Sequence, residues 1–209
     1  LLDLVVAVIV AVTYLNFNSN TIRLAVFDAN LTIPPLLFGA LTVALVWGSV
    51  NVTNCSDGVD GLSGTLAIIT LATFYVIDNI TGKDDFTFLI LIFIICILGY
   101  LWYNATPSRL IMGDAGSRAM GIFISITALK SGSPFMYLPV AAVFILDGGL
   151  GLLKVSLIRL FKIHILNHVR TPLHDHVRKN MGWSNTQTVV RFAIIQIVVS
   201  LAMVYAVLL

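Results

Sequence analysis

The sequence predicts an all-α protein that crosses a membrane several times, a polytopic integral membrane protein. Of its 209 residues, 58% are hydrophobic and only 11% are charged, and the mean hydropathy is +0.99. About a quarter of the residues in soluble domains are charged, so this composition argues strongly against a soluble globular domain. The formal net charge of +2 is too small to indicate a nucleic-acid partner.

Seven apolar stretches are long enough, or nearly so, to cross a bilayer. They cover residues 1–15, 35–50, 61–77, 86–103, 117–130, 135–161 and 189–208. Each ends at Asn, Asp, Gly, Ser or Pro, residues that commonly terminate helices. The first stretch opens without an initiator Met or a basic segment, so we expect an N-terminal piece to precede it.

The sixth stretch is too long for one straight crossing. Three glycines follow Asp147 within four residues, which weakens a helix and predicts a break or a kink. We expect the second half, with Lys154 and Arg159, to bend along the membrane interface; one straight tilted helix is the alternative. Asp147 lies at mid-membrane depth, where a carboxylate is either functional or caps the break.

Three polar connections, residues 51–64, 104–116 and 163–188, separate these stretches, and we call them the motif loops. Two spans lie between each successive pair, so the three loops are predicted to emerge on one membrane face. The basic residues near this face are Arg109, Arg118, Arg159, Lys162, Arg170, Arg178, Lys179 and Arg191. The opposite face has only Arg23, Lys83 and, at its edge, Lys130, so the positive-inside rule makes the motif face cytoplasmic.

The first motif loop has polar side chains three residues apart. They are Asn51, Asn54, Asp57 and Asp60. On a helix this spacing places amides and carboxylates on one face, and the glycines that follow allow a ligand to approach the backbone. Such a face can hold a nucleotide or a metal, although helix capping is the alternative.

The other two loops carry groups suited to phosphate. Asp114 stands beside the start of a helix at Ser117, an arrangement that suits a phosphate held through magnesium. His174, Asp175 and His176 lie among three cations. This third loop fits a phosphate clamp best, while a zinc site and a basic surface for anionic lipids are the alternatives.

Together the three motifs resemble the polyprenyl-phosphate N-acetylhexosamine-1-phosphate transferase superfamily. The matching segments are Asn51–Gly61, Met112–Ser117 and Thr171–His176. The resemblance covers essentially the whole chain and implies a single transmembrane transferase domain over residues 1–209. Members of the superfamily have ten spans, so the seven here correspond to spans four to ten, with the ninth broken.

The Thr-Pro-Leu-His form of the last motif looks most like the branch that serves peptidoglycan synthesis. That resemblance implies transfer of phospho-MurNAc-pentapeptide from UDP-MurNAc-pentapeptide to undecaprenyl phosphate, with Mg²⁺, giving lipid I and UMP. It also implies a homodimer in the bacterial cytoplasmic membrane, with the active site on the cytoplasmic face. Asp114 would hold the metal, Asp57 would orient metal or substrate, and His174 would contact phosphates or sugar. The implied substrate-binding residues are Asn51, Asn54, Gly58, Val59, Asp60, Asn104, Ile111, Ser117, Lys154 and His176.

The chain departs from the family pattern at three places. Asp175 replaces the middle one of three histidines, and Ile111 stands where an aromatic ring often stacks on uracil. The family's adjacent aspartate pair would precede Leu1, because Asp84 and Asp85 fall on the opposite face, where we expect a solvated turn. Two other functions stay open: a GlcNAc-1-phosphate transferase of teichoic-acid or O-antigen assembly, and a transporter with Asp147 on its ion path.

Overall fold

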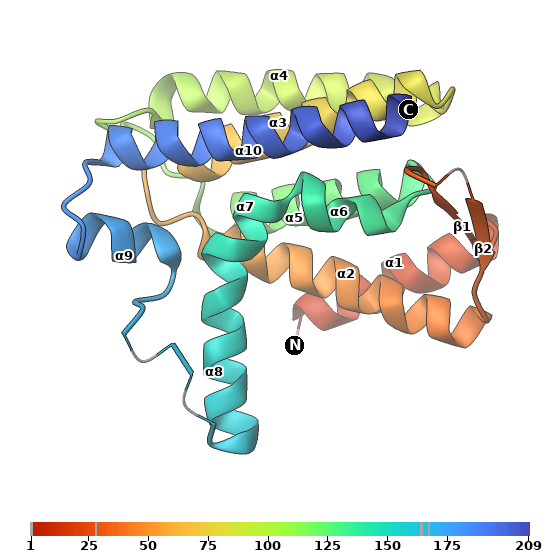
Figure 1. The fold of residues 1–209 in the computed structure, drawn as a ribbon, viewed down its shortest axis with the longest axis horizontal. Helices are drawn as coiled ribbons and strands as arrows, with labels where there is room; N and C mark the ends of the chain where they lie inside the picture. The colour runs from red at the N-terminus through yellow and green to blue at the C-terminus, as the bar shows by residue number, and fades with distance from the viewer. Residues whose placement is uncertain (1, 28, 164, 167) are drawn as a thin grey trace.

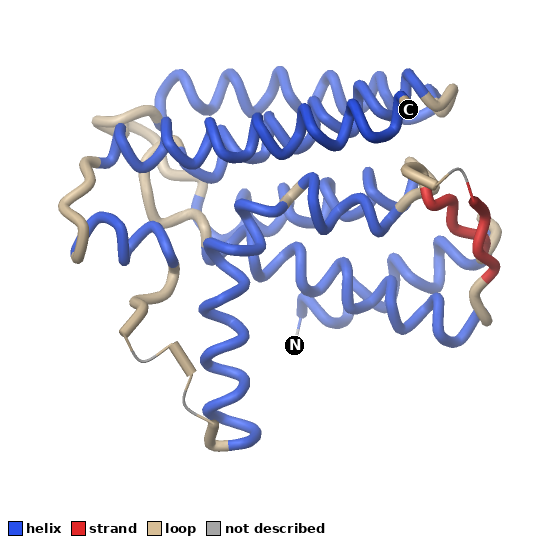
Figure 2. The backbone as a smooth tube through the Cα atoms, in the orientation of Figure 1, coloured by secondary structure: helices blue, strands red, loops and turns tan. Residues whose placement is uncertain are grey.

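The computed structural model describes residues 2–27, 29–163, 165–166 and 168–209, and nearly all regular structure there is helical. The long helices are α1 (Leu2–Phe17), α2 (Pro35–Cys55), α3 (Leu62–Ile80), α4 (Thr87–Asn104), α5 (Gly113–Lys130), α8 (Leu150–Phe161) and α10 (Asn185–Leu208). The short ones are η1 (Asp84–Phe86), η2 (Pro134–Met136), α6 (Tyr137–Val140), α7 (Ala142–Phe144), η3 (Ile145–Gly149) and α9 (Leu173–Lys179). One antiparallel hairpin, β1 (Thr21–Leu24) and β2 (Ala29–Thr32), follows α1 (Figure 2). The all-α prediction is confirmed.

Helix length and apolarity agree with a multi-pass membrane protein. In the described residues, four helices are long and apolar enough to cross a bilayer: α2, α3, α4 and α10. The bent segment from Pro134 to Phe161 makes a fifth if it counts as one span, and α1 is apolar but has only 16 residues. All seven predicted stretches contain helix, and the number of crossings stays a prediction.

The sixth stretch is broken, as its glycines predict, and the straight-helix alternative is wrong. Its two parts, Pro134–Val140 and Ala142–Phe161, are bent by 69°. Ala141 leaves helical geometry with φ −111° and ψ 25°, and a π-helical turn, η3, follows before α8. In Figure 1, α8 points away from the bundle, across the direction of α2 and α10.

Gln196 of α10 forms hydrogen bonds with backbone groups at this break. The fully buried Gln196 amide accepts a hydrogen bond from Val143 N (2.9 Å) and donates one to Val140 O (2.7 Å). Unsatisfied backbone groups cost several kcal/mol in hydrocarbon, so these bonds allow the helix to bend inside the bundle.

The helices form two groups that meet along the broken segment. Helices α3, α4 and α10 lie together, while α1, α2 and α5 form the other group (Figure 1). Gly121 of α5 packs on Val50 of α2 so closely that an added Cβ would lie 2.6 Å from the Val50 Cα. Ser49 Oγ donates to Gly121 O at 2.8 Å, which fixes the register of this contact.

The three motif loops lie at one end of the bundle, on the left in Figure 1, while the hairpin lies at the other. The even number of helices between successive loops predicts this arrangement. The connection that contains η1 belongs to the hairpin end, as expected for Asp84 and Asp85.

Candidate active site

Asn104, the last residue of α4, holds the first two motif loops together. Its Oδ1 accepts a hydrogen bond from Gly61 N (2.8 Å), and its Nδ2 donates to Leu110 O (2.8 Å) and Ser108 Oγ (3.2 Å). Gly61 has φ +82°, a left-handed conformation that favours glycine. Ser108 N also donates to Asp60 Oδ2 at 3.4 Å. The buried Asn104 side chain and the half-buried Asp60 therefore link the two loops.

Asn54 connects the end of α2 to the beginning of α5. Its Nδ2 donates to Ser117 Oγ at 2.9 Å, and Ser117 is fully buried. Asn51, one turn earlier, donates to Trp47 O within its own helix at 2.7 Å. These predicted substrate-binding side chains therefore have protein partners, and the Asn54 bond brings the Asp57 and Asp114 segments together.

Asp57 follows α2 in a half-buried turn. Its Oδ1 accepts a hydrogen bond from Ser63 Oγ at 2.5 Å. Burial raises the pKa of Asp57, and the charge of Asp114 raises it further, while the Ser63 bond and nearby His174 act in the opposite direction. The carboxylates of Asp57 and Asp114, which come from different motif loops, therefore repel each other electrostatically. A bound cation would reduce this repulsion.

Asp114 stands in the first turn of α5 and is the most open of the three predicted catalytic side chains, with 77% of its side chain exposed. Arg118, one turn later, donates to Asp114 Oδ2 at 3.2 Å and also pairs with Asp3 of α1. The helix N-terminus and Arg118 together favour a negative group here.

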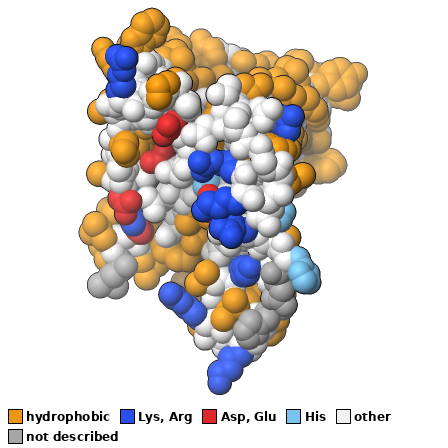
Figure 3. All heavy atoms as spheres, turned by 90° about the vertical axis from the view of Figure 1, so that its left-hand side faces the viewer, with side chains coloured by type: hydrophobic (Ala, Val, Ile, Leu, Met, Phe, Trp, Pro, Cys, Tyr) orange, Lys and Arg blue, Asp and Glu red, His pale blue; other side chains and the backbone are white. Residues whose placement is uncertain are grey.

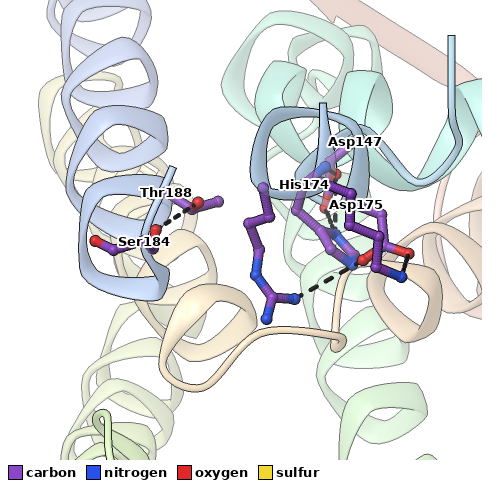
Figure 4. Close-up of polar contacts among 7 residues, drawn as sticks. Asp147, His174, Asp175, Ser184 and Thr188 are labelled. Carbon is purple, nitrogen blue, oxygen red and sulfur yellow. Dashed lines mark hydrogen bonds and ion pairs between the residues drawn. The ribbon is translucent and has the colours of Figure 1, made fainter. Parts of the chain in front are cut away.

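His174 is the buried residue of the third motif, Thr171–His176, and it contacts the broken helix (Figure 4). Its Nδ1 lies 2.9 Å from Asp147 Oδ2 and 3.1 Å from Oδ1, and its backbone N donates to Oδ1 at 2.7 Å. Asp147 is 0% exposed and His174 is 3% exposed. Asp147 is therefore the partner of the histidine motif, a role that the sequence left undecided between function and capping.

Gly58 lies against the other edge of the same imidazole. A Cβ at Gly58 would overlap with His174 Nε2, so only glycine allows the ring this close to the first motif loop. Val59 turns inward instead and is buried in the apolar core. His174 thus sits between the break in the sixth stretch and the loop that carries Asp57.

The remaining residues of the third loop form a basic edge. Burial raises the pKa of Asp175, but the hydrogen bond from Lys179 (3.0 Å) and the charges of Lys179, His174 and Arg178 outweigh it and lower the pKa. Figure 3 shows Lys and Arg side chains gathered on this face, with acidic side chains to one side.

Three other predicted substrate-binding residues are spread around this edge. His176 Nδ1 accepts a hydrogen bond from Arg170 N at 3.3 Å. Lys154 Nζ donates to Leu166 O and Val169 O, both at 3.0 Å, and so holds the segment after α8. Ile111 is exposed.

The donor set fits magnesium better than zinc. Among the described residues, no group of three or more His, Cys, Asp or Glu side chains could hold a metal by itself. Magnesium is usually held by one or two carboxylates together with substrate phosphates and water. Asp57 and Asp114 are the carboxylates at this end of the bundle that could supply such a site.

An apolar groove of about 380 Å³ runs along α2 beside the first half of the broken segment. Its lining includes Phe38, Leu45 and Val52 from α2, and Leu138 and Ile145 from the broken segment. Val52 lies two residues before Asn54, so this end of the groove is near the first motif loop.

Sequence reasoning did not identify the Ser63 bond to Asp57 or the pairing of Arg118 with Asp3. Ser63 and Arg118 both lie in segments that the sequence analysis singled out, but nothing in the sequence indicates which side chains they would meet. The one available signal was a charged residue, Arg118, inside an apolar stretch.

The glycosyl transferase family 4 model matches residues 1–132. A phospho-N-acetylmuramoyl-pentapeptide-transferase of Treponema pallidum (strain Nichols) is 41% identical over 189 residues, covering 81% of this chain and 51% of the relative. Proteins of the same name from Borrelia hermsii and Rubrobacter xylanophilus are 33% identical over 163 residues and 29% over 200 residues. These two matches cover 71% and 93% of this chain, and 46% and 59% of the relatives. The chain thus spans about half the length of the curated relatives it matches.

Proposed function

The chain belongs to glycosyl transferase family 4, and we propose that the intact protein transfers phospho-MurNAc-pentapeptide from UDP-MurNAc-pentapeptide to undecaprenyl phosphate. The products would be lipid I and UMP. The names of the relatives support this choice of substrates. The observation that carries the proposal is that the three motif loops lie together at one end of a membrane bundle, joined by the Asn54–Ser117 bond and by the packing of Gly58 on His174.

The chemistry requires two anionic substrates to approach each other. Bound Mg²⁺ would neutralise phosphate charge, so that the lipid phosphate oxygen can attack the sugar-linked phosphate of the UDP substrate. Asp114, which is open to solvent, would hold the metal, and Asp57 would orient metal or substrate from the loop beside it. His174 would contact a phosphate through Nε2, the ring nitrogen that faces Gly58.

The apolar groove along α2 supports a polyprenyl co-substrate. It is lined almost entirely by apolar side chains and leads to the turn of α2 before Asp57. A polyprenyl chain in this groove would place its phosphate beside the polar loops while the chain stays in hydrocarbon.

This multi-pass protein would lie in the bacterial cytoplasmic membrane, with the motif loops in the cytoplasm. The excess of basic residues at the motif end supports that orientation. We expect a homodimer from the family resemblance alone.

A GlcNAc-1-phosphate transferase would use the same fold and metal site. The test offers UDP-MurNAc-pentapeptide and UDP-GlcNAc side by side to the intact protein in membranes with undecaprenyl phosphate. We expect lipid-linked product from the first donor only. Product from UDP-GlcNAc alone would overturn the choice of substrate.

A transporter would place its ion site near the membrane midplane. Asp147 bonds instead to His174, a residue of the third motif loop. This pairing favours a site at the edge of the bundle.

A further inference from the structure

We propose that Asp147 is a positioning residue that acts through His174. Its carboxylate fixes the imidazole with Nδ1 toward the broken helix and Nε2 toward the Asp57–Gly58 turn. The proposal rests on the proposed function, because it assumes that Nε2 meets a substrate phosphate.

The first argument is the number and direction of the bonds. The Asp147 carboxylate lies within 3.1 Å of His174 Nδ1 at both oxygens and accepts the His174 backbone N–H at 2.7 Å. Because a carboxylate only accepts hydrogen bonds, Nδ1 carries a hydrogen in this contact. Backbone and ring are held by the same group, so neither can turn without losing a bond.

The second argument is the rigidity of the segment that carries Asp147. The residue lies in the π-helical turn η3, and its neighbour Gly148 packs on α2 so closely that a Cβ would overlap with Val52 O. Val52 lies on the last part of α2, five residues before Asp57. Asp147 is therefore fixed relative to the helix that leads into the first motif loop. π-Helical turns are frequent at functional sites.

The third argument is the cost of the carboxylate. Asp147 is fully buried, and burying a carboxylate is costly unless it is paired and hydrogen-bonded. Fixing the tautomer and direction of a histidine is a recognised task for such a carboxylate. This role accounts both for the burial of Asp147 and for its direction (Figure 4).

The test is a double-mutant cycle on the intact, membrane-reconstituted protein with Asp147→Asn and His174→Gln. Glutamine can place an amide near the position of Nε2 but has no counterpart of Nδ1. We expect Asp147→Asn to lower kcat roughly 10- to 100-fold, the loss typical of a carboxylate that orients a functional histidine, with a smaller change in KM. In the His174→Gln background the same change should cost less than twofold. If Asp147→Asn lowered kcat by the same factor in the parent and in His174→Gln, the proposal would be overturned. A carboxylate with a merely structural role would affect kcat in both backgrounds.

Asp78→Asn is the matched control. Asp78 is also a buried carboxylate in a long apolar helix, but it lies toward the hairpin end of α3. We expect its replacement to leave kcat within about twofold in both backgrounds. A loss of kcat equal to that of Asp147→Asn would overturn the proposal, since any buried carboxylate would then have the same effect. Melting temperatures in detergent are measured for every variant, and the kcat comparison uses protein that melts like the parent.

Asp114→Ala in the same assay separates this proposal from the proposed function. If Asp114→Ala abolishes turnover while Asp147→Asn is fully active, only the positioning role is wrong. If Asp114→Ala retains turnover, the metal assignment in the proposed function is wrong, and the cycle still reports the coupling of Asp147 to His174.

Discussion

The two ends of the bundle use polar groups differently. At the motif end, side-chain bonds join segments far apart in sequence: Asn54 to Ser117, Asn104 to Gly61, and Asp147 to His174. At the hairpin end, Asn20 bonds to Ile33 O across the hairpin and Asn79 to Tyr75 O within its own helix. Long-range exceptions there are Tyr14 OH, which donates to Leu129 O, and Lys130 Nζ, which donates to Asn18 Oδ1. Polar bonds thus secure helix ends everywhere, but at the motif end they assemble groups that can react.

The largest difference between the two ends should appear on removal of an exposed carboxylate. Asp114→Ala is expected to lower product formation at least 100-fold, because charge stabilisation at the transferring phosphate is lost. Asp85→Ala, an exposed carboxylate at the hairpin end, is the control and should stay within about twofold. Radiolabelled lipid product from the intact protein measures both. Equal losses would remove the functional distinction between the ends.

Gly58→Ala tests whether the imidazole of His174 must lie this close to the first motif loop. The added Cβ would overlap with Nε2, so the ring must shift and kcat should fall roughly tenfold or more, as misplacement of a functional group does. Gly99→Ala is the control, since nothing lies within 4 Å of its added Cβ. Unchanged kcat in Gly58→Ala would show that the position of the imidazole is not critical.

Asn104→Ala tests how firmly the two loops are joined. It leaves the buried Gly61 N without its side-chain partner, which costs about 1–3 kcal/mol, while Leu110 O keeps the hydrogen bond from Ser108 Oγ. Melting of the intact protein in detergent should therefore occur at lower temperature. Asn79→Ala loses a bond within its own exposed helix turn and should change the free energy of unfolding by about 0.5 kcal/mol or less. A larger effect at Asn79 would contradict the comparison.

The smallest effect is expected from the basic edge. The folded protein lowers the pKa of Asp175, so its ion pairs stabilise the fold above the ordinary value of about 3.9 and are lost as pH falls through the folded value. The contribution should be below about 1 kcal/mol, because the Lys179 partner is half exposed. Melting curves of parent and Asp175→Asn should therefore converge as pH decreases from 6 to 3. A constant gap would contradict this account.

The sequence predicted which residues lie at the same end of the bundle, but not which side chains they contact. It indicated that Asp57, Asp114 and His174 share one end of the bundle, since apolar stretches set the number of helices between loops. The family resemblance implied that Asn104 and Ser117 bind substrate, and the structure shows that both side chains also have protein partners. Spacing along one helix says nothing about which neighbouring helix an amide will meet, so these bonds could not be predicted.

The length and order of the apolar runs, together with the glycines after Asp147, determined the all-α membrane fold, the broken sixth stretch and the common end of the three motif loops. These features follow from local physics, because hydrocarbon requires helices of a certain length and glycine weakens them. Only the tertiary structure decided that Asp147 faces His174, that Gly58 lies under its ring and that Gln196 satisfies the broken backbone. Those contacts depend on how closely particular helices approach, which is set by packing of residues distant in the chain.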